Sequence, residues 1–182
     1  MNDMYEEILD VAEKLFMTKG YQATSTRQIT EILGVSQPTI YYHFKNKEEI
    51  YYHVMLRLSE DVRINLGSIS ENQEKTLEEK LVSMTEFLKA KHPFNLFLML
   101  HDIQHTLSPA LSKKLYVLWE ASYKQPFITL FSKHNNQLRK EMNLEFVVRY
   151  LFMLIASYLE KGEQEYELQE SIDLFLHGVI KD

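Results

Sequence analysis

An all-helical fold is predicted for this chain by three features of its sequence. Apolar residues recur at helical spacing through most of the 182 residues, and the chain holds only 5 Gly and 4 Pro. No stretch alternates apolar and polar residues as a half-buried strand does. Because 45% of the residues are hydrophobic, a chain of this length buries a sizeable core. We expect about nine helices, arranged as an N-terminal unit of three and a larger helical C-terminal domain.

The first two predicted helices are bounded by capping signals. Residues 8–16 place apolar side chains on one helix face, and Gly20 ends that helix. Ser25 and Gln28 have the spacing of a capping box, which predicts that a second helix begins at residue 26. Gly34 closes this helix, because glycine adopts the left-handed conformation that a C-terminal cap often requires.

A tight turn and a short polar-faced helix follow in residues 34–47, GVSQPTIYYHFKNK. Ser36 is a good N-cap residue, and Pro38 is tolerated in a first helical turn. Ile40 and Phe44 lie four residues apart and share the face that packs inward, which leaves polar side chains on the opposite face. Three helices in about fifty residues make a unit of the size of a helix-turn-helix motif.

A long fourth helix is predicted to link this unit to the rest of the chain. Asn46 caps it, residues 48–66 form it, and Gly67 with the polar residues that follow stops it. We therefore expect a helix-turn-helix DNA-binding domain in residues 1–47 and a second domain in residues 48–182. Further helices are predicted at 76–91, at 94–106, from Pro109 onward with a kink at Pro126, between Asn143 and Gly162, and at 168–180.

The run ILDVAEKLFMTKGYQATSTRQITEILGVSQPTIYYHFKNKEEI resembles the N-terminal domain of the TetR (tetracycline repressor) family of bacterial transcription regulators. Within it, TRQITEILGVSQPTIYYHFKNK is most similar to the recognition region of the tetracycline repressor itself. Thr30 departs from the pattern, because the wider family most often has alanine there. The resemblance implies that the following residues contact DNA: Thr26, Arg27, Gln37, Pro38, Thr39, Tyr41, Tyr42, His43 and Lys47.

The charge pattern favours selective over general DNA binding. The chain has a formal net charge of -6, whereas nonspecific nucleic-acid binders are usually basic. Five acidic residues lie within residues 3–13, while Arg27, Lys45 and Lys47 gather around the turn. A locally positive but globally acidic protein is expected to bind random DNA weakly and to depend on base readout.

Two apolar stripes near the C-terminus predict a dimer interface. Residues 146–159 are apolar except for Arg149 and Ser157, so this helix must be covered on all sides. The segment is too short to cross a bilayer, so its cover must be protein and no membrane partner is expected. A central helix of a bundle is the alternative. The family resemblance implies a homodimer through the last two helices, with these residues in the interface: Phe146, Tyr150, Leu151, Leu154, Tyr158, Ile172, Phe175, Leu176 and Val179.

The middle helices carry aromatic and methionine side chains that suit either an apolar cavity or an ordinary core. The cavity hypothesis leads to a repressor that an unidentified small-molecule effector releases from a palindromic double-stranded DNA operator. The alternative is a related DNA-binding protein controlled by a protein partner, without a small-molecule ligand. The residues expected to line an effector site are Phe87, Phe97, His101, His105, Tyr116, Trp119 and Tyr123.

His101 and His105 lie four residues apart on one helix face, the spacing that lets two imidazoles reach one metal ion. A metal-dependent enzyme is therefore a third hypothesis. Asp102 is shorter than the glutamate that such enzymes use, and no third ligand follows at the usual spacing. We therefore expect no enzyme activity, no metal site and no cofactor. The absence of cysteine and of a signal peptide favours a cytoplasmic protein.

Overall fold

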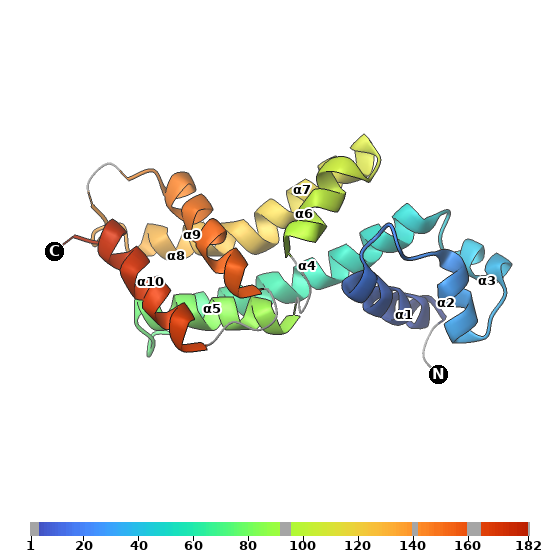
Figure 1. Cartoon of the computed structure of the whole chain (residues 1–182), viewed down its shortest axis with the longest axis horizontal. Helices are drawn as coiled ribbons and strands as arrows, with labels where there is room; N and C mark the ends of the chain where they lie inside the picture. The colour runs from blue at the N-terminus through green and yellow to red at the C-terminus, as the bar shows by residue number, and fades with distance from the viewer. Residues whose placement is uncertain (1–3, 92–95, 140–141, 160–164, 182) are drawn as a thin grey trace. The chain divides into compact units, whose positions relative to one another are not determined.

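The computed structural model describes residues 4–91, 96–139, 142–159 and 165–181. These stretches hold ten α-helices and one π-helical segment (Figure 1). Their only β-type contact is an isolated antiparallel bridge between Leu138 and Ile180. The elements are α1 (Met4–Lys19), α2 (Thr26–Leu33), α3 (Gln37–His43), α4 (Lys47–Glu71), α5 (Leu77–Lys91), α6 (Leu96–His105), α7 (Pro109–Trp119), η1 (Glu120–Lys124), α8 (Gln125–Lys133), α9 (Leu144–Leu159) and α10 (Glu165–Val179). The predicted all-helical class is confirmed.

The chain divides into two compact units. The first unit comprises residues 1–59 and 97–118, and the second comprises residues 60–96 and 119–182. Most of α6 and α7 therefore belongs with the N-terminal helices, although these helices follow α5 in the sequence. The domain boundary between residues 47 and 48 stays a prediction.

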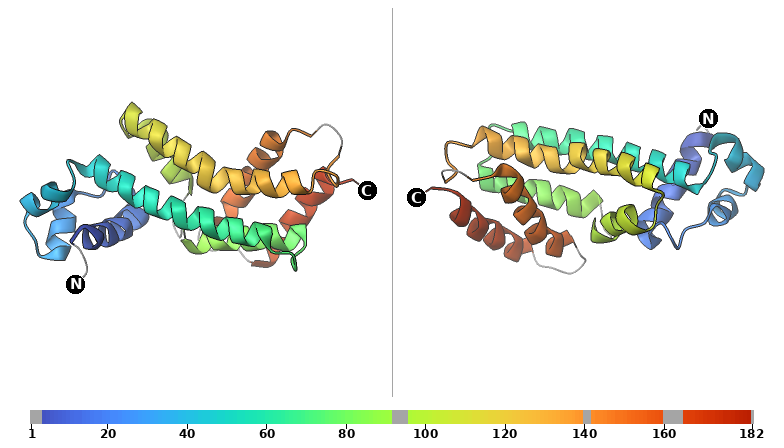
Figure 2. Two further views of the ribbon diagram at one scale, coloured as in Figure 1. Left: turned by 180° about the vertical axis from the view of Figure 1, so that it is seen from behind. Right: turned by 90° about the horizontal axis from the view of Figure 1, so that it is seen from above.

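The first unit packs α1, α2 and α3 around fully buried aliphatic and aromatic side chains. Helices α1 and α2 contact each other, as do α2 and α3, and the views in Figure 2 show the three gathered beside one another. Ile8, Ile29 and Ile40 have no exposed surface. Phe44 is stacked on Tyr5 with 4.9 Å between ring centroids.

The second unit is built mainly from α5, α8, α9 and α10, and it also includes η1 and the part of α4 from residue 60 onward. Helix α5 contacts both α9 and α10, and α9 also contacts α8 and α10. Leu81, Met84, Phe127, Phe131 and Leu151 are fully buried among them. Every helix in the described stretches is too short or too polar to span a lipid bilayer.

The predicted stop at Gly67 is wrong. Helix α4 continues to Glu71, although a glycine inside a helix costs about 1 kcal/mol relative to alanine. Val62, Leu66 and Ser70 follow at four-residue spacing and are all buried. Burial of this inner face outweighs the weak helix propensity of one glycine.

Pro126 is accommodated by a change of helix type. No loop separates α7 from α8, and residues Glu120–Lys124 form the π-helical segment η1. The amide of Gln125 donates to the carbonyl of Glu120, five residues earlier. A proline cannot donate to the carbonyl four residues before it and clashes with it, so the wider π-turn just before Pro126 relieves both problems.

The remaining predicted helices agree with the structure to within a few residues. The predicted segment at 76–91 is α5, and Thr76 caps it by accepting from the amide of Glu79. Asn143 caps α9, because its side-chain oxygen accepts from the amide of Phe146. The last helix begins at Glu165, three residues before the predicted start. The predicted stop at Gly162 lies outside the described residues.

Candidate nucleic-acid interface

The turn between α2 and α3 is fixed by local capping interactions. The hydroxyl of Ser25 accepts from the amide of Gln28, and the Gln28 side chain accepts from the amide of Ser25, so the predicted capping box is confirmed. Gly34 adopts the left-handed conformation with φ 67° and donates its amide to the carbonyl of Thr30. A side chain at this position would be strained. The chain therefore enters α3 in a defined direction.

Thr30 fits the close packing of α2 despite its departure from the family pattern. The residue is buried, and its hydroxyl donates to the carbonyl of Arg27 at 2.7 Å. This bond gives the Thr30 hydroxyl, which alanine does not have, a hydrogen-bond partner. A buried hydroxyl without a partner would be destabilising.

Helix α3 separates a buried face from an exposed face, as the sequence predicts. Ile40 and Phe44 have at most 1% exposure. Gln37, Pro38 and Tyr42 are exposed on the outer side, and Tyr42 is 86% exposed. A short helix with a packed inner face and an exposed polar side chain, that of Gln37, in its first turn is the geometry of a recognition helix.

The cap expected from Ser36 is only partly present. Ser36 occupies the N-cap position, but its side chain makes no hydrogen bond to a backbone amide. Its hydroxyl instead lies 3.0 Å from the hydroxyl of Thr39. The Ser36 hydroxyl is engaged with Thr39 instead of with a backbone amide. The start of α3 is therefore stabilised by Pro38 and by packing rather than by a serine cap.

The other residues expected to contact DNA surround this outer face. Tyr41 and Arg27 are exposed, and Thr26 and His43 are partly exposed. The Arg27 Nε atom pairs with the Glu31 carboxylate at 3.0 Å on the same helix, an exposed pair that is easily broken in favour of a phosphate.

Lys47 is placed differently from what the family resemblance implies. Its Nζ atom donates to the carbonyls of Tyr21 and Thr24 at 2.9 Å each. It also lies 4.0 Å from the centroid of the Tyr21 ring. The ammonium group therefore points into the turn between α1 and α2. By contrast, Lys45, two residues earlier, is exposed.

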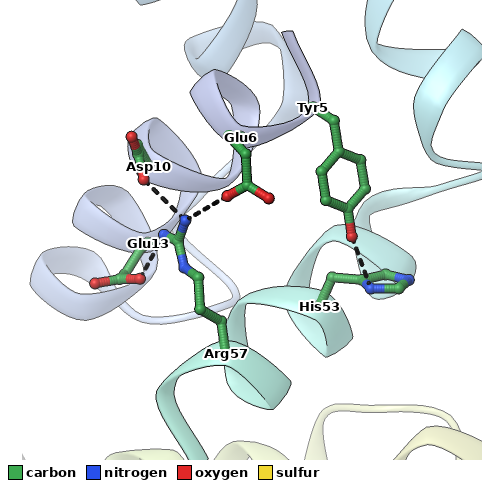
Figure 3. A network of polar contacts seen from close by, with 6 residues as sticks. All are labelled: Tyr5, Glu6, Asp10, Glu13, His53 and Arg57. Carbon is green, nitrogen blue, oxygen red and sulfur yellow. Dashed lines mark hydrogen bonds and ion pairs between the residues drawn. The ribbon is translucent and has the colours of Figure 1, made fainter. Parts of the chain in front are cut away.

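Arg57 ties α1 to the first half of α4. Its guanidinium Nη1 atom donates to Glu6 at 3.2 Å and to Asp10 at 2.8 Å, and Nη2 donates to Glu13 at 2.6 Å (Figure 3). The carboxylates, Glu13 foremost, raise the pKa of the Arg57 guanidinium, although its partial burial acts to lower it.

Three of the acidic residues that make the N-terminal region formally acidic, Glu6, Asp10 and Glu13, are thus turned toward Arg57. Their spacing of four and three residues on one helix face could have predicted a cationic partner. Nothing local could have identified it as a residue of α4. The same two helices are also joined where Tyr5 Oη lies 3.0 Å from Nδ1 of His53 (Figure 3).

The N-terminal part of the chain matches a family of known proteins. Residues 8–54 match the family model described as bacterial regulatory proteins, tetR family. The N-terminal region of the chain is that of the tetR family. The uncharacterized HTH-type transcriptional regulator YvkB of Bacillus subtilis (strain 168) is 38% identical over 82 residues, which are 45% of this chain and 41% of YvkB. The match thus spans less than half of that relative.

Two further proteins are similar to the chain over almost its whole length. The fatty acid metabolism regulator protein of Bacillus subtilis (strain 168) is 24% identical over 172 residues, 94% of this chain and 74% of the relative. The solved structure of the fatty acid degradation regulator FadR from Bacillus halodurans has a TM-score of 0.75 at 18% identity and covers 98% and 97% of the two chains. This structural likeness shows the fold. The family and its named members are transcriptional regulators rather than enzymes.

The residues expected to line an effector site fall in both units of the chain. Phe97, His101, His105 and Tyr116 belong to the first unit, and Phe87, Trp119 and Tyr123 to the second. Tyr123 is buried, whereas Tyr116 is 53% exposed. The side chain of Phe97 lies outside the described residues. Their role in effector binding stays a prediction.

The histidine pair has no third metal ligand among the described residues. His101 and His105 are exposed on α6 with 4.9 Å between ring centroids. Asp102, which lies between them in sequence, is buried and accepts from the backbone amide of Tyr21 at 3.2 Å. Its carboxylate is therefore engaged and is not free to act as a catalytic base for the pair. In the part of the chain that the structure describes, no group of three or more potential ligands is placed to hold a metal ion.

The residues expected at a dimer interface separate into buried and exposed sets. Leu151, Ile172, Phe175, Leu176 and Val179 are buried within the chain, whereas Phe146 and Tyr150 are more than half exposed and Leu154 and Tyr158 are intermediate. Two exposed residues that the sequence pattern did not single out, Met153 at 66% and Leu174 at 73%, add to the outer face.

Proposed function

We propose that this chain is a sequence-specific transcriptional regulator that reads a palindromic double-stranded operator as a homodimer. The observation that carries the proposal is the outer face of α3, where Gln37 and Thr39 lie in the first turn above a fully packed inner face. Side-chain amides and hydroxyls at the N-terminal end of a recognition helix meet base edges in the major groove. Such a regulator acts where the DNA lies, so we place it in the cytoplasm.

The proposed dimer interface is the exposed apolar face of α9 and α10. Phe146, Tyr150 and Leu174 line a groove of about 420 Å³ on this face, and Met153 adds to the exposed apolar surface of α9. Exposed apolar patches of this kind usually mark a protein contact. A two-fold dimer presents two recognition helices about one DNA turn apart, which requires an operator with two half-sites.

We further propose that the protein is a repressor released by a small-molecule effector bound in the C-terminal domain. A relative that aligns over 94% of this chain and 74% of its own length is a fatty acid metabolism regulator, so fatty acids are the first effectors to test. Release requires that the effector bind the DNA-free state more tightly than the DNA-bound state. Control by a protein partner is the alternative, and the absence of a response to any small molecule would favour it.

The experiment is a selection of bound sequences from a random duplex pool, using the purified full chain. We expect a two-fold symmetric site. Gln37→Ala and Thr39→Ala should each relax base preference at particular positions, at a cost of about 1 to 3 kcal/mol for the preferred base. Gln125→Ala, at an exposed glutamine of the second unit, is the matched control and should select the wild-type sequence. Unchanged discrimination in both α3 variants would remove this helix from the reading surface.

A further inference from the structure

A buried carboxylate from α6 holds the turn between α1 and α2. Asp102 is 4% exposed. Its Oδ2 atom accepts from the backbone amide of Tyr21 at 3.2 Å, and its Oδ1 atom accepts from the Thr106 hydroxyl at 3.3 Å. A buried charge is costly unless hydrogen bonds or an opposite charge compensate it. Because the buried Asp102 carboxylate needs its hydrogen bond to Tyr21, α6 has to stay packed against the α1–α2 turn.

The opposite charge at this turn comes from Lys47 at the start of α4. Two of its N–H groups are used by the carbonyls of Tyr21 and Thr24, and the Tyr21 ring lies under the ammonium at 4.0 Å. Burial lowers the pKa of Lys47, and the charge of Asp102 acts in the opposite direction. Lys47 and Asp102 thus both hydrogen-bond to the backbone of the turn, Lys47 to the carbonyls of Tyr21 and Thr24 and Asp102 to the amide of Tyr21.

Two further polar contacts join the corner between α6 and α7 to the same place. The Glu48 carboxylate accepts from the amide of Ser108 at 2.8 Å and from its hydroxyl at 2.7 Å. Gln22 donates from Nε2 to the Thr106 hydroxyl at 3.1 Å. Burial and the nearby Glu48 and Asp102 charges raise the pKa of Tyr21 to about 12, so its hydroxyl stays neutral. The turn is held from α4 by Lys47, from α6 by Asp102 and from Thr106 just after α6.

This turn leads directly into the DNA-reading helices. Thr24, whose carbonyl accepts from Lys47, precedes Ser25, the residue whose capping box begins α2. Helix α2 in turn packs on α3. A shift of the turn therefore changes where α2 begins, and with it the orientation of the recognition helix.

We propose that Lys47 and Asp102 are positioning residues for DNA binding, and that Lys47 acts through the α1–α2 turn rather than by neutralising a phosphate. The proposal rests on the DNA-binding function proposed above. It differs from the role that the family resemblance implies for Lys47. The exposed Lys45 is the neighbouring side chain that is free to meet a phosphate.

Salt dependence separates the two roles. Each phosphate contact that is lost reduces the slope of log affinity against log salt by about 0.9. A residue that only positions the reading helices lowers affinity by the same factor at every salt concentration. The test measures binding of the full chain to its selected operator across a salt series, for wild type, Lys47→Met and Lys45→Met.

We expect Lys47→Met to lose about tenfold in affinity, the size expected when buried hydrogen-bond acceptors lose their donor, with an unchanged slope. Lys45→Met should reduce the slope. A slope that falls by about 0.9 in Lys47→Met would overturn the positioning role. A wild-type protein that selects no sequence would instead contradict the proposed function itself.

Asp102→Asn tests the proposal independently if Lys47→Met fails to fold. Removing a negative charge from a DNA-binding protein favours binding by simple electrostatics, whereas loss of a positioning residue lowers affinity, so the sign of the change decides. We expect a loss of several-fold, with the exposed Glu74→Gln as a matched control that shows none. A gain of affinity in Asp102→Asn would overturn the proposal. Additive effects of Lys47→Met and Asp102→Asn in the double variant would do so too, because two residues that hold one turn should couple.

Discussion

Each of the two units is stabilised internally by a different kind of contact. In the first unit, segments far apart in sequence are joined by hydrogen bonds from buried or half-buried charged groups, among them Lys47, Arg57 and Asp102. In the second unit, the long-range ion pairs include a surface pair between Lys91 and Asp61 and a pair from the half-buried Lys124 to Glu145, and apolar packing of α5, α8, α9 and α10 joins most of the elements. Directional bonds fix an orientation, whereas apolar packing mainly fixes proximity. In the unit that carries the recognition helix, directional hydrogen bonds therefore fix the orientation of the helices.

The largest expected effect comes from two variants that each remove one core aromatic side chain, one variant in each unit. Phe44→Ala and Phe127→Ala should each lower the free energy of unfolding by about 3 to 5 kcal/mol, because both rings are fully packed. Hydrogen exchange should rise mainly in α1–α3 for the first variant and mainly in α8–α10 for the second. Leu56→Ala, at a partly exposed residue, is the control. A uniform rise throughout the chain in both variants would show a single cooperative unit and break the division.

A second test concerns the apolar surface that each unit exposes. Leu174→Glu should weaken the dimer by more than tenfold, because a charge would be buried in the proposed interface. Val117→Glu makes the same kind of change at an exposed residue of the first unit and should leave the dimer intact. Sedimentation at micromolar concentration measures both. A Leu174→Glu protein that stays dimeric would place the interface elsewhere.

The smallest expected effect compares two serines within the first unit. Ser25→Ala removes a complete capping box and should cost about 1 kcal/mol of stability. Ser36→Ala removes a hydroxyl whose one hydrogen bond among the described residues is to Thr39, so its cost should be no more than about half as large. Chemical denaturation of the two variants measures the difference. Equal losses would show that Ser36 caps α3 in solution.

Local chemistry accounts for what could be read from the sequence. The Ser25 capping box, the left-handed Gly34 and the Ile40–Phe44 face each involve residues a few positions apart, so spacing alone predicted them. The stop at Gly67 was wrong, because burial of α4 on distant helices outweighed a local preference. The direction of Lys47 was missed for a related reason: its acceptors lie 23 and 26 residues away in sequence.

Less of the second unit could be predicted from the sequence. Its aromatic side chains have the same spacing whether they fill a core or line a cavity, so spacing could not separate the buried Tyr123 from the exposed Tyr116 of the first unit. In the same way, the stripe on α10 did not reveal that Ile172 faces inward while Leu174 faces outward. Which side of a helix is covered depends on partners that the sequence pattern does not specify.

The Arg57 cluster bears on how salt experiments on this protein are read. One guanidinium meets three carboxylates, from Glu6, Asp10 and Glu13. Dissolved ions screen the attraction to Arg57, but they also screen the repulsion among the carboxylates. These two effects oppose each other, so the junction of α1 with α4 should hold nearly equally well in dilute and concentrated salt. A steep loss of DNA affinity on adding salt would then report ions displaced from the nucleic acid and not a loosening of the protein.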